Sequence, residues 1–200
     1  AELKRIAAYV ENAMTNGTNK RLVITSPNKG EGKTMLAAGL AVQAAGTFSF
    51  KVLAVDLHWR APSLHTYFQK EQNFDDSQAG SAEQVLGFVQ ETGISGLDLL
   101  AAPRETRADR TELGLKLSRE VLDKAISHYD RIVVDTGALF PPNRFMLDPM
   151  NYARDADGSI MVILGGVTPR ESAKRASLMF SNSGARLIGV VMNQWQNPLK

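Results

Sequence analysis

Short apolar runs alternate with longer mixed stretches along most of the chain. These runs lack an alternating polar face, which is typical of strands that are covered on both sides by helices. The pattern predicts strands at Leu22–Thr25, Val52–Val55, Leu97–Leu100, Ile132–Val134, Ile160–Leu164 and Leu187–Met192. A series of strand–helix–strand units predicts an α/β fold, with one open, mostly parallel sheet and helices on both faces.

Helix signals lie between the expected strands. Three residues are each followed, three positions later, by Glu or Gln, as in a capping box: Ser81, Asp109 and Thr168. The proline after Thr168 suits the first position of a helix. Further helices are expected over Glu2–Met14 and Met35–Ala45. We find no repeat or linker that divides the chain, so we expect a single domain over residues 1–200.

Composition narrows the class of protein. The 200 residues include 23 basic and 21 acidic side chains, and a net charge of +2 gives no reason to expect nucleic acid as a partner. The absence of cysteine excludes disulfides and cysteine-based metal sites. No apolar run reaches the roughly 20 residues that span a bilayer, and Ala1–Arg5 lacks a signal-peptide core. We therefore expect a cytoplasmic domain.

The stretch Leu22–Thr34 carries the clearest chemistry. An apolar strand leads into a loop with Gly30 and Gly32, then Gly-Lys-Thr, then a helix-like run. Such a P-loop holds phosphates with backbone N–H groups at a helix N-terminus, while its lysine reaches the terminal phosphates and its hydroxyl binds Mg²⁺. Pro27 stands where the usual pattern has glycine. The alternative is a glycine-rich turn with a chance Lys-Thr, but the flanking strand and helix favour the P-loop. The residues expected to contact ATP or ADP are Asn28, Lys29, Gly30, Glu31, Gly32, Lys33, Thr34 and Met35.

Two aspartates follow apolar strands. Asp56 comes after Val52–Val55, and Asp135 after Ile132–Val134. Ligands in parallel sheets bind beyond the carboxyl ends of strands, and a P-loop needs acids there to hold the metal and orient the attacking group. Each could be an ordinary strand-end residue, yet their position beside a P-loop favours a site that joins both aspartates, Lys33 and Thr34.

Several segments together resemble a known family, the bacterial tyrosine kinases (BY-kinases). These are cytoplasmic ATPase domains that govern the chain length of capsular and exopolysaccharides. Asp56–His65 is similar to the family's second nucleotide motif, D-x-D-x-R followed by a proline-containing turn. The other matching segments are Tyr129–Thr136, Ala156–Ile160, Gly166–Arg170 and Gly189–Asn193.

The resemblance implies a P-loop NTPase fold and a tyrosine kinase that uses ATP and Mg²⁺. It implies catalytic roles for Lys33, Asp56 and Asp135, metal binding by Thr34 and both aspartates, and nucleotide contacts from Arg60 and Asn193. It further implies a membrane-anchored polysaccharide co-polymerase, or its activating cytoplasmic tail, as partner. The domain would then lie at the inner face of the plasma membrane, with a homo-oligomer as a possible assembly.

The chain departs from the family pattern at several positions. His58 replaces the second aspartate of D-x-D-x-R, and Lys29 stands where the family usually has proline. A histidine is a poor Mg²⁺ ligand, so His58 could act as a general base or simply pack. Ala8 replaces an arginine used in ring assembly, and the sequence given ends without a tyrosine-rich tail.

These departures keep two other functions open. One is a regulatory or scaffold module that binds nucleotide without phosphorylating protein. The other is a partition-type ATPase, but Asn28 stands where those proteins carry an additional lysine, which makes this the weakest interpretation.

Overall fold

The computed structural model describes residues 2–14, 20–59, 61–105, 111–141 and 147–194. Within these residues, seven strands form one sheet in the order β3-β4-β2-β5-β1-β6-β7. The strands are β1 (Arg21–Ser26), β2 (Val52–Asp56), β3 (Gln90–Glu91), β4 (Leu97–Leu100), β5 (Arg131–Ala138), β6 (Gly158–Leu164) and β7 (Leu187–Asn193). All neighbouring strands are parallel except β3, which pairs antiparallel with β4.

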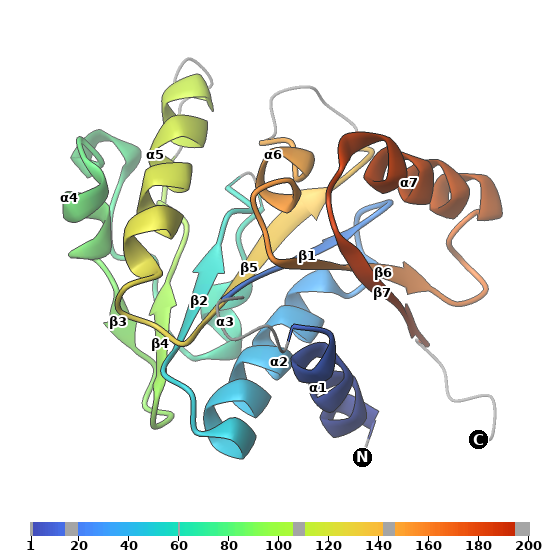
Figure 1. The fold of residues 1–200 in the computed structure, drawn as a ribbon. Helices are drawn as coiled ribbons and strands as arrows, with labels where there is room; N and C mark the ends of the chain where they lie inside the picture. The colour runs from blue at the N-terminus through green and yellow to red at the C-terminus, as the bar shows by residue number, and fades with distance from the viewer. Residues whose placement is uncertain (1, 15–19, 60, 106–110, 142–146, 195–200) are drawn as a thin grey trace.

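Helices cover both faces of this sheet (Figure 1). One face packs against α1 (Glu2–Ala13), α2 (Lys33–Phe48) and α3 (Leu64–Tyr67). The other packs against α4 (Ala82–Leu86), α5 (Thr111–Ala125), α6 (Met150–Ala153) and α7 (Arg170–Ser183). A short 3₁₀ helix, η1 (Asp76–Gln78), precedes α4. The central strands are therefore shielded on both sides, which is why they are mostly apolar.

The expected strands and their parallel arrangement are confirmed. The sequence pattern missed β3, because this two-residue, half-exposed strand has no apolar run. The Ser81 cap is also confirmed, since its hydroxyl accepts a hydrogen bond from the Gln84 backbone N–H. The prediction that Thr168 caps a helix is wrong, because α7 starts at Arg170 and no side chain caps it. Asp109 lies outside the described residues.

The sheet brings the expected site together at the carboxyl ends of its central strands. Strand β5 lies between β1, which leads into the P-loop, and β2, which ends in Asp56. In the β2–β5 pairing Asp56 lies directly opposite Asp135. Within the described residues, no helix has the length and apolar character needed to cross a membrane.

Candidate nucleotide site

The P-loop turns sharply between β1 and α2. Gly30 and Gly32 have φ angles of 84° and 95°, a left-handed conformation that favours glycine. A Cβ added to Gly32 would lie 2.3 Å from Nδ2 of Asn193, so the amide would have to move, and the left-handed backbone itself favours glycine there. The loop leads directly into α2, whose N-terminal N–H groups can hold an anion.

Glu31 braces the loop from within. One carboxylate oxygen accepts a hydrogen bond from the Asn28 backbone N–H at 2.7 Å, and the other from the Asn28 amide at 3.0 Å. The Thr168 hydroxyl also donates to Glu31. Because Thr168 additionally accepts from the Leu164 backbone N–H, its oxygen is engaged away from the start of α7. Glu31 is thus positioned to shape the loop with its side chain.

An open cleft of about 510 Å³ lies over the loop. Its lining residues are Lys29, Gly30, Gly32, Lys33, Thr34, Met35, His58, Ala61, Ser63, Tyr67, Asn193 and Gln194. Lys33 is only 5% exposed. Burial lowers the pKa of Lys33, while Asp135 and Glu31 oppose the shift. A phosphate group would give this buried ammonium a further negative partner.

The two aspartates differ in their hydrogen bonding. Asp56 accepts hydrogen bonds from three backbone N–H groups, those of His58 at 2.9 Å, Ser63 at 3.1 Å and Leu64 at 3.0 Å. It therefore anchors the segment that follows β2. These three donors favour the charged carboxylate, although burial raises the pKa of Asp56.

Asp135 has no such support. It is fully buried, no backbone N–H group among the described residues donates to it, and its oxygens lack a partner of good hydrogen-bond geometry there, although the Thr34 hydroxyl lies close enough to stabilise its charge. Burial, and secondly the charge of Asp56, raises the pKa of Asp135 to about 8. The Thr34 hydroxyl and the positive charge of Lys33 lower the pKa but do not cancel this rise. The buried Asp135 carboxylate and the nearby Thr34 hydroxyl are oxygen ligands of the kind that a hard cation such as Mg²⁺ takes.

The residues present therefore fit a Mg²⁺ ion bound together with phosphates. Within the described part of the chain, no three acidic, histidine or cysteine side chains form a ready-made metal cluster. Mg²⁺ usually takes one or two protein ligands and completes its shell with water and substrate phosphates. Thr34 and Asp135 suit that arrangement, and Asp56 lies next to them.

Comparison with known proteins also indicates a nucleotide-binding domain. The family model described as the CobQ/CobB/MinD/ParA nucleotide binding domain matches residues 22–200. The tyrosine-protein kinase YwqD of Bacillus subtilis (strain 168) is 31% identical over 196 residues, which are 96% of this chain and 79% of that protein. This chain is a bacterial tyrosine kinase family member.

Solved structures agree with the family assignment. The VpsO kinase domain superposes with a TM-score of 0.77 at 27% identity, covering 96% of this chain and 93% of that one. The septum site-determining protein MinD of Pyrococcus horikoshii OT3, complexed with Mg-ADP, gives a TM-score of 0.67 at 19% identity, over 88% of this chain and 71% of that one. The latter likeness shows the shared fold.

The BY-kinase domain has its unusual His58 at the wall of the cleft. His58 is 8% exposed and lines the cleft together with Lys33 and Thr34. Burial, reinforced by Lys33 and Lys29, lowers the pKa of His58 to about 4. The imidazole is therefore neutral near pH 7 and is a weak general base.

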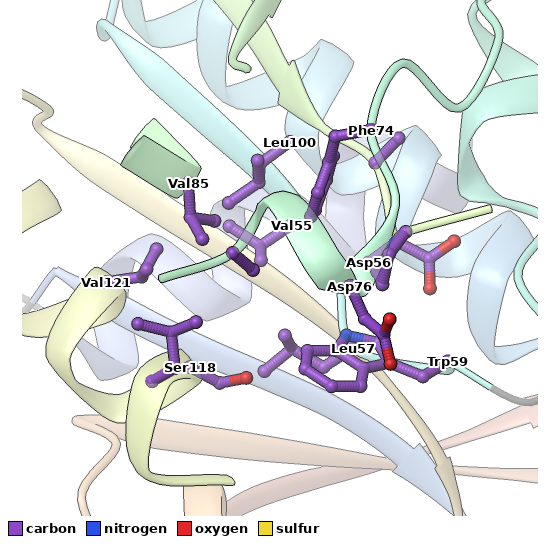
Figure 2. Close-up of a pocket in the computed structure, with 14 residues that line it drawn as sticks. Val55, Asp56, Leu57, Trp59, Phe74, Asp76, Val85, Leu100, Ser118 and Val121 are labelled. Atoms are coloured by element: carbon purple, nitrogen blue, oxygen red, sulfur yellow. The ribbon is translucent and has the colours of Figure 1, made fainter. Parts of the chain in front are cut away.

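The residues on either side of His58, Leu57 and Trp59, line a small, mostly apolar cavity of about 30 Å³ (Figure 2). Its walls come from the end of β2 and the following residues, including Trp59, and from Ser118 and Val121 of α5. A Cβ added to Gly114 of α5 would lie 2.2 Å from the Trp59 ring, so the indole packs directly on that helix. The contact between Trp59 and Gly114 and the hydrogen bonds to Asp56 together fix the segment that follows β2.

The remaining expected contacts are distributed around the cleft. Met35 and Asn193 line it, and the Asn193 amide donates to the Glu31 backbone carbonyl at 3.2 Å. Arg60 lies outside the described residues. The sequence reasoning missed Ser63 and Tyr67, which also line the cleft. The Ser63 hydroxyl lies 3.5 Å from that of Thr34, and only its place just after the D-x-D-x-R segment could have indicated this.

Proposed function

We propose that this domain binds ATP with Mg²⁺ in the cleft over the P-loop and transfers the terminal phosphoryl group to a tyrosine hydroxyl. The single observation that carries the proposal is the juxtaposition of buried Lys33 with the unpartnered carboxylate of Asp135 beneath the P-loop. The family relationship supplies the reaction class, since YwqD is named a tyrosine-protein kinase.

Each residue has a role that follows from its position. Backbone N–H groups from Lys29 to Thr34 would hold the phosphates, and Lys33 would balance their charge. Thr34 and Asp135 would hold the ion, which when bound supplies charge stabilisation to the transferring group. Asp56 fixes the loop that forms the opposite wall and remains the proposed base for the acceptor hydroxyl. Burial raises the pKa of Asp56 although three backbone N–H groups stabilise its charge. Because the same hydrogen bonds hold the carboxylate in place, positioning is expected to dominate catalysis.

The partner and location rest on the family alone. We propose that the domain works in exopolysaccharide or capsule synthesis, at the inner face of the plasma membrane, through a membrane-anchored co-polymerase whose cytoplasmic tail activates it. The solved chimerical protein CapA2B2, with a TM-score of 0.75 over 92% of this chain at 24% identity, shares the fold. Self-association into a homo-oligomer is part of the same proposal.

The test is a phosphotyrosine assay on the purified domain with Mg²⁺ and ATP, with and without the fused activating tail. We expect ATP-dependent incorporation that Lys33→Ala abolishes. Because this chain's acceptor tyrosine is unidentified, a tyrosine-containing copolymer is supplied as an alternative acceptor. Absence of incorporation under all these conditions would contradict the proposal.

His58 favours one other function, a nucleotide-binding regulatory module without kinase activity. The same assay on His58→Asp separates the two. Activity that is weak in the wild type and stronger in His58→Asp indicates a damped kinase, whereas nucleotide binding without transfer in either protein indicates the regulatory module.

A further inference from the structure

Two residues make the cleft more positive than the family pattern predicts. By the family resemblance described above, position 58 corresponds to the second aspartate of D-x-D-x-R and position 29 to a usual proline, whereas this chain has His58 and Lys29. Both residues line the same cleft. The first exchange removes a carboxylate and the second adds an ammonium group, so both make the charge of the cleft more positive.

The remaining acids around the loop are already engaged or lie below it. The Glu31 carboxylate accepts three hydrogen bonds from Asn28 and Thr168. The Asp56 carboxylate accepts three from the backbone. Neither Asp56 nor Asp135 lines the cleft, whereas Lys29, Lys33 and His58 do.

This charge distribution changes what a phosphate group requires. A carboxylate at position 58 would repel the phosphates unless a divalent cation lay between them. An imidazole is either neutral or positively charged near pH 7, and in both forms it can donate a hydrogen bond to a phosphate oxygen. Lys29 offers a further positive charge at the open side of the cleft, where it is exposed.

We propose that His58 and Lys29 are phosphate-binding residues that let this cleft hold a nucleoside diphosphate without a divalent cation. The inference rests on the proposed nucleotide site, and it deepens that proposal by defining how the site recognises its ligand. Mg²⁺ would then be needed for phosphoryl transfer more than for binding.

The experiment is calorimetric titration of ADP into the whole domain, once in excess Mg²⁺ and once in excess EDTA. For the wild type we expect affinities in the two buffers that differ by less than about tenfold, because protein charges replace the cation. His58→Asp should lose at least about tenfold more affinity in EDTA than in Mg²⁺. Lys29→Ala should also lose more ADP affinity in EDTA than in Mg²⁺, by a smaller factor than His58→Asp.

Matched variants make the result specific. His128→Asp introduces the same charge at an exposed position after α5 and should keep the wild-type ratio between the two buffers. His58→Ala removes the donor without adding charge, and should lose affinity in EDTA several-fold even if His58→Asp fails to fold. Thermal unfolding of each variant, recorded without ligand, identifies any folding defect.

The outcomes separate the two proposals. Wild-type binding that requires Mg²⁺, or an unchanged buffer ratio in the His58 variants that fold, overturns this inference and leaves the nucleotide site standing. Absence of wild-type binding in both buffers overturns the proposed nucleotide site and this inference with it.

Discussion

At the scale of single residues, the two buried aspartates show how neighbours divide two roles between identical side chains. Three backbone N–H groups stabilise the charge on Asp56, whereas Asp135 has buried oxygens without partners. Two adjacent carboxylates in a dry site do not both ionise readily. The proton is therefore expected on Asp135 until a cation takes its place.

Asp135→Asn tests this assignment through stability. The pKa of Asp135 is raised from 3.8 to about 8 in the folded domain. Between those values the folded state binds more protons than the unfolded chain, so the free energy of unfolding should fall as pH rises from about 4 to 8. In Asp135→Asn this decline should be smaller, and at pH 9 the variant should melt at a higher temperature than the wild type without ligand.

The measurement is thermal unfolding across this pH range. Exposed Glu171→Gln on α7 is the control, and its pH profile should follow that of the wild type. Equal pH profiles for wild type and Asp135→Asn would show that Asp135 is ionised in the free domain.

At the scale of elements, side-chain contacts tie the P-loop to its neighbours. Thr168 between β6 and α7 donates to Glu31 and accepts from the Leu164 backbone N–H. Thr168→Val keeps the shape and removes both hydrogen bonds, which should cost about 1–3 kcal/mol of stability and lower nucleotide affinity several-fold.

Unfolding and ADP titrations would measure both effects. Thr168→Ser keeps the hydroxyl and should stay close to the wild type. A Thr168→Val domain that binds ADP as tightly as the wild type would contradict the bracing role of Glu31.

A second link joins the segment after β2 to α5 through Trp59 and Gly114. Gly114→Ala would place a methyl group against the indole, where a Cβ lies 2.2 Å from the ring. The ring must move, so we expect a destabilisation of about 1–3 kcal/mol and altered Trp59 fluorescence.

Gly46→Ala in α2 is the matched control, because its added Cβ meets nothing within 4 Å. It should be neutral or stabilising. Introducing Trp195→Phe in each protein leaves Trp59 as the only tryptophan, so the measured fluorescence comes from Trp59 alone. Unchanged fluorescence in Gly114→Ala would contradict the contact.

At the scale of the whole molecule, the sequence predicted the parallel sheet, and it placed the two aspartates at the same edge of that sheet. Apolar runs mark strands buried on both faces, and the ends of those strands place Asp56 and Asp135 beside each other. Periodicity alone cannot show which partner a side chain chooses. Thr168 therefore looked like a helix cap, although it bonds to Glu31, and the roles of Ser63 and Gly114 depend on contacts between distant segments.

The central claim is that the cleft over the P-loop binds a nucleotide through Lys33. Titration of Mg²⁺-ADP into the wild-type domain, Lys33→Ala and the exposed-surface control Lys174→Ala tests it most directly. The account predicts saturable binding for the wild type and Lys174→Ala, and an affinity loss of roughly tenfold to a hundredfold or more for Lys33→Ala, because a charged hydrogen bond is removed. Equal affinity in all three proteins, or no binding to the wild type, would contradict it.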